Sequence, residues 1–183
     1  MKRGPILMVT ALFLTALSIP AWAFDKTTRM GEPKSAPSSS RISMGVRLMD
    51  EFPGLKDFPV EKDDLAYELF YEYHEGIGLW QIGAAYIPDG DERFDYLVTP
   101  QVNLIFKDRI YRLGSGVLKS CVATEDGEDW TDLYWQVIAG LGFTFGDFIG
   151  LDISAHYVFK KWKDIADTDM AAVDYSARLS LSF

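Results

Sequence analysis

The sequence VDYSARLSLSF, residues 173–183, alternates between apolar and polar side chains along its whole length. The odd positions are Val, Tyr, Ala, Leu, Leu and Phe, and the even positions are Asp, Ser, Arg, Ser and Ser. Because successive side chains of a β-strand point to opposite faces, this stretch predicts a strand with one apolar and one polar face. In a soluble protein the apolar face of such a strand would pack against a core. This stretch alone therefore does not determine the fold, and the remaining sequence is needed.

The same alternation occurs in seven other stretches, at residues 41–48, 65–74, 79–87, 96–106, 110–120, 133–143 and 148–159. The connections alternate between long polar segments, at 50–64, 88–93, 121–132 and 160–172, and tight turns, at 75–78, 107–109 and 145–147. Long loops at one rim and short turns at the other are typical of outer-membrane barrels. The sequence therefore predicts an all-β, eight-stranded antiparallel transmembrane up-and-down β-barrel.

The N-terminal residues predict an export signal and a flexible lead-in. Residues 1–23 begin with Lys2 and Arg3, continue through an apolar stretch at 6–19 and end with Ala21-Trp22-Ala23, the pattern of a cleaved signal peptide. The apolar stretch is too short to cross a bilayer as a helix. Residues 24–39 are rich in Pro, Ser and charge, which predicts a disordered periplasmic lead-in before a barrel at 40–183.

Charge and composition exclude several classes of protein. The predicted signal contains two of the 18 Lys and Arg and none of the 27 Asp and Glu, so the remainder carries a net charge of −11. Nucleic acid recognition needs a basic footprint, and we therefore expect no nucleic acid partner. Cys121 is the one cysteine, which excludes an intrachain disulfide framework and leaves no lipid-anchor cysteine after the signal. No run of 18 apolar residues follows the signal, so no transmembrane helix is predicted.

The aromatic residues separate a membrane barrel from a soluble barrel that turns its apolar side inward. On the apolar faces they form two groups, one toward each rim. The group near the short turns comprises Tyr73, Trp80, Phe106, Phe143 and Phe183, and the group near the long loops comprises Tyr67, Tyr86, Tyr96, Trp135 and Tyr175. Two aromatic girdles suit a lipid-facing surface with two interfaces.

The opposite, polar faces of the strands must fill the interior of an eight-stranded barrel. Buried charges are tolerated there when they are paired. The charged positions that we predict to form a lumen ion network are Arg41, Arg47, Glu68, Glu72, Asp152 and Arg178. Matching the strands about their turns places Arg41 near Glu72, Arg47 near Glu68, and Arg178 near Asp152 or Ser154. Such a network predicts a plugged lumen and not a pore.

The last strand also resembles the C-terminal signal by which outer-membrane barrels are recognised by their assembly machinery, with Phe183 as the terminal aromatic residue. This resemblance implies that the assembly machinery is one partner. Outer-membrane lipid and lipopolysaccharide are the other partners expected. The sequence thus predicts location in the outer membrane of a Gram-negative bacterium, with both chain ends in the periplasm and four outer loops.

The stretch IAGLGFTFGDFIGLDISAHYVF, residues 138–159, resembles the corresponding part of the lipid A 3-O-deacylase family, which are eight-stranded outer-membrane barrels. The resemblance implies that His156 occupies the position of the catalytic histidine. The family's nucleophilic serine follows two positions later, where this chain has Val158, and a valine cannot form an acyl-enzyme. A substitute triad of Ser176, His156 and Asp174 would arise if the last two strands placed Ser176 opposite His156.

The outer loops are acidic, with carboxylates at 50, 51, 57, 61, 63 and 64 and again at 125, 126, 128, 129 and 132. Carboxylates suit Ca²⁺ or Mg²⁺, but EDGEDWTD lacks the spacing of a calcium loop, so we expect solvated loops and no metal or cofactor. The sequence favours a non-catalytic envelope barrel that serves membrane integrity or surface interaction. The alternatives are a lipid A acyl hydrolase that uses His156 and a conduit for small hydrophobic molecules.

Overall fold

Ten β-strands and one short 3₁₀ helix occur among the residues that the computed structural model describes, which are 39–51, 59–75, 77–88, 93–146, 148–166 and 171–183. The elements are β1 (Ser39–Leu48), β2 (Leu65–Glu75), β3 (Gly78–Ile87), β4 (Tyr96–Asp108), β5 (Tyr111–Leu118), β6 (Cys121–Thr124), β7 (Gly127–Trp130), β8 (Tyr134–Phe145), β9 (Ile149–Phe159), η2 (Trp162–Asp164) and β10 (Ala171–Ser182). No helix among these residues is long and apolar enough to cross a membrane. The predicted signal peptide and the lead-in up to residue 38 lie outside them.

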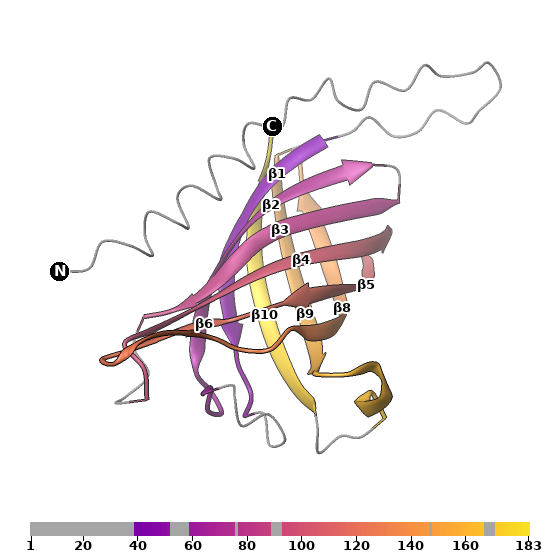
Figure 1. Ribbon diagram of the computed structural model, residues 1–183. Helices are drawn as coiled ribbons and strands as arrows, with labels where there is room; N and C mark the ends of the chain where they lie inside the picture. The colour runs from indigo at the N-terminus through magenta and orange to yellow at the C-terminus, as the bar shows by residue number, and fades with distance from the viewer. Residues whose placement is uncertain (1–38, 52–58, 76, 89–92, 147, 167–170) are drawn as a thin grey trace, which may run out of the picture. The chain divides into compact units, whose positions relative to one another are not determined.

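Eight of the strands close into an antiparallel barrel in the order β1-β2-β3-β4-β5-β8-β9-β10, with β10 paired back to β1 (Figure 1). Every neighbouring pair in this ring is antiparallel, and the closing pair sets Ile42 opposite Leu181. Each of the eight stretches of alternating sequence forms one strand of the ring. The predicted eight-stranded antiparallel barrel is confirmed.

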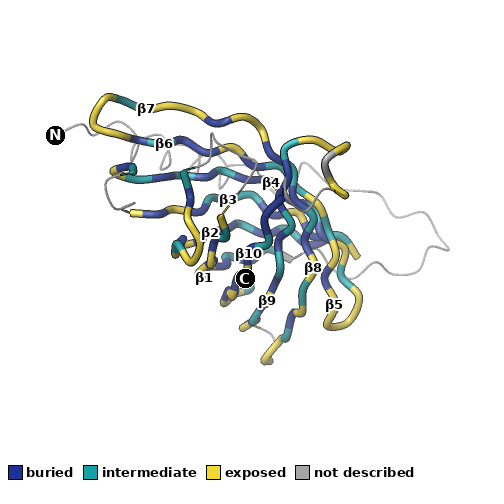
Figure 2. Tube along the Cα trace, turned by 90° about the horizontal axis from the view of Figure 1, so that it is seen from below, coloured by how far each residue is buried: buried dark blue, intermediate teal, exposed yellow. Residues whose placement is uncertain are grey.

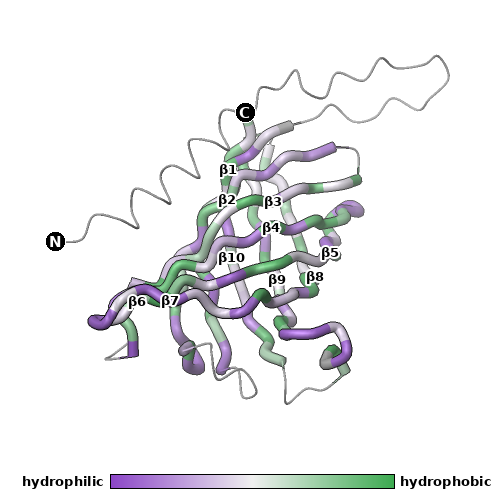
Figure 3. The backbone as a smooth tube through the Cα atoms, viewed as in Figure 1, coloured by the Kyte–Doolittle hydropathy of each residue, from purple (hydrophilic) through white to green (hydrophobic). Residues whose placement is uncertain are grey.

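The barrel buries its polar faces and exposes its apolar ones. Along β1 the apolar Met44 is 56% exposed, whereas the charged Arg47 is 1% exposed. Burial alternates along the strands in Figure 2, and hydropathy alternates along them in Figure 3. Over the middle of the barrel the buried positions are held by polar residues. A soluble barrel has the reverse arrangement, because its apolar side chains need a core. The outer wall is therefore a lipid-facing surface.

The aromatic side chains of the outer wall lie toward the two rims. In the β2–β3 register, Tyr73 pairs with Trp80 near the short turn, and Tyr67 pairs with Tyr86 toward the long loops. Trp80 and Tyr67 are 47% and 52% exposed. Phe183, at the end of the chain, is 70% exposed. This distribution matches the two interfacial belts expected of a membrane barrel.

The third long connection differs from the prediction. Residues 121–132 were expected to form a polar loop, but they contain β6 and β7, a hairpin whose first strand pairs with the outer end of β4. Glu125 and Asp126 form its turn, and Gly127 follows with a φ of 152°, which L-residues rarely adopt. The hairpin carries the sheet beyond the barrel wall at the long-loop end.

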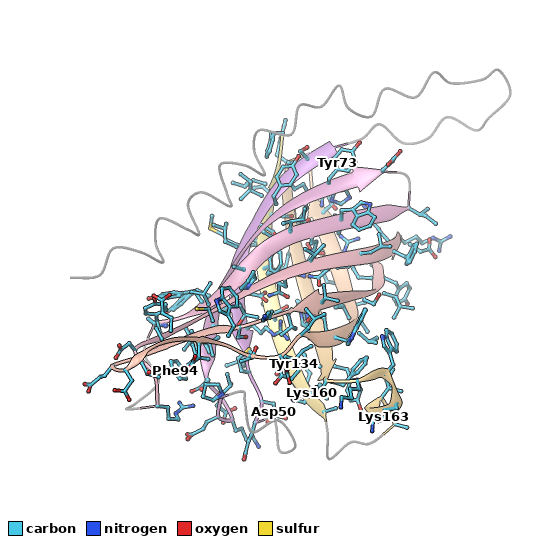
Figure 4. The ribbon with its side chains drawn as sticks, viewed as in Figure 1. Asp50, Tyr73, Phe94, Tyr134, Lys160 and Lys163 are labelled. Carbon is cyan, nitrogen blue, oxygen red and sulfur yellow. The ribbon has the colours of Figure 1, made fainter. Side chains whose placement is uncertain are left out.

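An apolar cluster closes the lumen at the long-loop end. Inward positions at the ends of the strands turn from polar to apolar there, and Met49, Val60 and Phe94 join them from the connections. Figure 4 shows Phe94 and Tyr134 toward this end of the barrel and Tyr73 at the other. The outer cap, as we call this cluster, comprises Met49, Val60, Ala66, Ala85, Ile87, Phe94, Leu97, Leu118, Tyr134, Val158 and Ala172.

Candidate functional site

The shortest ion pair in the described part of the lumen joins Arg47 on β1 to Asp174 on β10. Nε of Arg47 donates to Oδ2 of Asp174 at 2.9 Å, and Nη2 donates to the same oxygen at 2.5 Å. Oδ1 of Asp174 accepts the backbone N–H of Asp50 at 2.9 Å. Both side chains are buried, so the carboxylate neutralises the guanidinium and also anchors the first residues after β1.

Glu68 lies between two arginines at the middle of the lumen. Its carboxylate oxygens are 3.8 Å from Nη1 of Arg47 and 3.9 Å from Nε of Arg178. The guanidinium of Arg178 also stacks over the ring of Phe70, with 5.0 Å from Cζ to the ring centroid. Arg47, Glu68, Arg178 and Asp174 therefore form one connected charge network across three strands.

Asp152 pairs with Arg112, which is not among the six residues predicted to form the lumen ion network. The register sets Arg178 opposite Asp152, but Asp152 accepts its hydrogen bond from Nε of Arg112 at 2.8 Å. Arg112 reaches across β8 to do so, because Gly142 lies between them with no side chain. Arg41 lies opposite Glu72 in the β1–β2 register, yet its Nε and Nη1 make no hydrogen bond.

His156 contacts a serine but not the predicted aspartate. Nε2 of His156 lies 3.0 Å from Oγ of Ser176, and Nδ1 lies 3.1 Å from Oε1 of Gln136. The prediction set Ser176 opposite His156, whereas in the β9–β10 register Asp174 is opposite His156 and Ser176 is opposite Ser154. Asp174 is held by Arg47 instead, so the third position of the triad is taken by Gln136.

This arrangement differs chemically from a hydrolytic triad. A triad carboxylate stabilises the imidazolium that forms when the histidine takes the serine proton. A carboxamide at that position carries no charge and cannot stabilise the imidazolium in this way. His156 and Ser176 are 0% and 3% exposed, and Val158, also 0% exposed, belongs to the outer cap above them. The serine and the histidine are therefore both buried among the residues that the structure describes.

The polar filling of the lumen also includes uncharged amide side chains, which are not among the predicted site residues. Nε2 of Gln136 donates to Oε1 of Gln101 at 2.8 Å and to Oδ1 of Asn103 at 2.7 Å. Nε2 of Gln81 donates to Oε1 of Glu72 at 2.8 Å. These side chains stand at inward positions of β3, β4 and β8, so the period-two pattern located them without indicating a role.

The chain forms a closed ring of eight lipid-facing strands around a polar, hydrogen-bonded interior. This fold is that of small outer-membrane barrels. The chain is similar to the crystal structure of Neisserial surface protein A (NspA), with a TM-score of 0.50 and 11% identity over 80% of this chain and 96% of that one. It is also similar to Ail, the attachment invasion locus protein of Yersinia pestis, with a TM-score of 0.47 and 14% identity over 80% of this chain and 97% of that one.

Comparison with known sequences does not assign this chain to a family. No protein-family model matches the chain, and no curated protein matches it. The likeness to NspA is a likeness of fold, and it supports the small outer-membrane barrel without supporting the deacylase family in particular.

The acidic loops at the long-loop end are partly paired. Arg93 binds Asp64 through Nη1 at 3.0 Å and lies 3.5 Å from Glu61, which ties two loops together. Lys160 binds Asp132 at 2.5 Å and lowers the pKa of that carboxyl. Asp57 lies outside the described residues. Within the described ranges, no group of three or more His, Cys, Asp or Glu side chains could hold a metal ion.

Proposed function

We propose that this chain is a small, non-catalytic outer-membrane barrel whose closed interior makes it a rigid support for its outer loops. The observation that carries this proposal is the combination of the outer cap with the Arg47–Asp174 and Glu68–Arg178 network beneath it. A lumen filled in this way leaves the loops and the lipid-facing wall as the surfaces that meet other molecules. The chain would serve envelope integrity or surface interaction.

The same surfaces support the location and the partners that we propose. The lipid-facing wall with aromatic rims supports residence in the outer membrane, with the short turns in the periplasm. Lipopolysaccharide would surround the long-loop end. The barrel assembly machinery would recognise the last strand and Phe183, which is exposed at the opposite end. Residues 1–23 would be removed as the signal peptide during export.

The closed lumen predicts an absence of ion conductance. Purified full-length protein inserted into planar lipid bilayers is expected to give no discrete channel steps, because polar side chains fill the cross-section and the outer cap covers them. A general porin run in the same bilayer serves as the control for insertion. Reproducible conductance steps would contradict the plug and would restore the conduit as the leading interpretation.

A second candidate function, lipid A acyl hydrolysis, is favoured by one contact, the 3.0 Å separation of Ser176 Oγ and His156 Nε2. Mass spectrometry of lipid A from cells that express the protein, compared with His156→Ala and Ser176→Ala variants, separates the two functions. The non-catalytic barrel predicts identical lipid A in all three. Loss of one acyl chain that both variants prevent would establish a hydrolase with Ser176 as nucleophile.

A further inference from the structure

Three basic side chains enter the lumen at its short-turn end from three different strands. Arg41 comes from β1, Lys107 from β4 and Arg112 from β5. Lys107 is directly opposite Arg112 in the β4–β5 register. Arg41 and Arg112 are 8% and 5% exposed, while Lys107 is half-buried. We call these three residues the inner basic cluster.

Two glycines on the facing wall leave room for the guanidinium groups of this cluster. A Cβ atom at Gly142 on β8 would collide with the guanidinium of Arg112, and one at Gly150 on β9 would lie 3.5 Å from Nη1 of Arg41. Gly142 is opposite Asp152, which is two residues from Gly150 along β9. Arg41 and Arg112 thus approach the same part of β9 from opposite sides.

The nearby carboxylates do not balance the inner basic cluster. Asp152 is engaged by Nε of Arg112 at 2.8 Å, and Glu72 is the second acidic group of this region. Lys107 is repelled by Arg112 and Arg41 and attracted by Asp152 and Glu72. Among the residues that the structure describes, three cations therefore share two carboxylates, which leaves this part of the lumen with a net positive charge.

Several buried donors of the cluster have no acceptor. Nε and Nη1 of Arg41 and Nη1 of Arg112 make no hydrogen bond, and neither does the buried Oγ of Ser180 beside Arg41. A buried donor without a partner costs free energy, and the cost is larger for a charged group. An anion with several oxygens would satisfy these donors together, through charge-assisted and bidentate bonds.

We propose that the inner basic cluster binds a phosphate-type oxyanion at the short-turn mouth of the lumen. Arg41 and Arg112 supply the hydrogen bonds from opposite walls, Ser180 supplies a hydroxyl, and Lys107 supplies charge at the entrance. Donors on several walls suit the tetrahedral oxygens of phosphate better than the two coplanar oxygens of a carboxylate. This site is independent of the outer loops and of the role proposed for them.

Thermal unfolding of the full-length protein in maltoside micelles tests the proposal. Inorganic phosphate, added at constant ionic strength in place of chloride, is expected to raise the unfolding midpoint, because a ligand that binds the folded state stabilises it. Arg41→Gln should weaken the apparent phosphate affinity by about tenfold or more, since it removes charge-assisted hydrogen bonds. No phosphate-dependent shift in the unaltered protein would overturn the proposal.

Lys107→Gln gives a second variant that keeps the test decisive if Arg41→Gln folds poorly. In chloride it should raise the unfolding midpoint, because it relieves the repulsion by Arg41 and Arg112, and it should reduce the response to phosphate. Arg109→Gln is the matched control, because Arg109 is exposed in the same β4–β5 turn. An equal loss of the phosphate response in the control would show general charge screening and would overturn the site.

The source of the phosphate is distinguished by a lipid arm of the same experiment. Nanodiscs that contain phosphatidylglycerol are compared with nanodiscs of uncharged glycolipid, both without free phosphate. Stabilisation by phosphatidylglycerol that Arg41→Gln and Lys107→Gln remove assigns the site to a lipid headgroup, whereas stabilisation by inorganic phosphate alone assigns it to the free ion. Stabilisation by the lipid that survives both substitutions contradicts the site.

Discussion

Asp174→Ala is expected to lower the free energy of unfolding by about 3–5 kcal/mol, the usual cost of leaving one member of a buried ion pair without its partner. Asp174 holds both Nε and Nη2 of Arg47 and accepts the backbone N–H of Asp50. Glu68 is 3.8 Å from Arg47, but it also serves Arg178 and cannot replace the lost carboxylate. Urea titration of the barrel in lipid vesicles, followed by Trp fluorescence, measures the change.

Two further variants separate the charge effect from general damage. Asp129→Ala removes an exposed carboxylate of β7 and should change the unfolding free energy by less than about 0.5 kcal/mol. The double substitution Arg47→Met with Asp174→Leu removes both charges and should recover most of the loss, because buried ion pairs can be replaced by apolar residues of similar volume. A double variant that is no better than Asp174→Ala would contradict the stranded charge as the cause.

Ile153→Arg is expected to destabilise the barrel by about 2–4 kcal/mol in a lipid bilayer, which is the cost of a basic residue near the bilayer midplane. Ile153 is 49% exposed on the outer wall, near the middle of β9, between Leu141 and Ala177 on the neighbouring strands. On the surface of a soluble protein the same change would have little effect. The same urea titration in vesicles therefore tests the lipid-facing wall directly.

Phe148→Arg is the matched control for depth. Phe148 is 68% exposed and lies directly before β9, at the short-turn rim. A basic residue near the interface should cost only about 0–1 kcal/mol, because its charge reaches water. Equal effects at positions 153 and 148 would argue against a membrane-buried middle and for a wall that faces a uniform environment.

The strands and their two faces could be predicted from the sequence because a membrane barrel imposes period two on both faces at once. Residues such as Met44 and Leu179 face lipid, and Arg47 and Arg178 face the lumen, so neither face is free to vary in polarity. The same constraint limits the strand registers, because a shift by one residue would turn the lumen residues toward lipid. Arg41 lies opposite Glu72 as expected, although a long connection separates β1 from β2.

Contacts across the lumen could not be predicted in the same way, because they depend on side-chain length and on which positions lack a side chain. Arg112 contacts Asp152 across Gly142, which has no side chain to block it. Asp174 binds Arg47, and His156 is therefore hydrogen-bonded to Gln136 and not to Asp174. The alternation of polar and apolar residues predicts that these side chains point into the lumen, but it does not predict which of them contact one another. The outer cap could not be predicted for a related reason, because its residues come from the strand ends and from loops, where side chains do not alternate in polarity.

The pairing of β1 with β10 also determines when the fold can be completed. The ladder from Arg41–Ser182 to Leu48–Tyr175 joins the strands that come first and last in the ring, so it forms only after the intervening strands have been made. Pairings between segments distant in sequence are slow, and until closure β1 and β10 are open edges that can pair with other chains. Refolding yield should therefore fall as protein concentration rises, and a factor that shields these two edges would raise it.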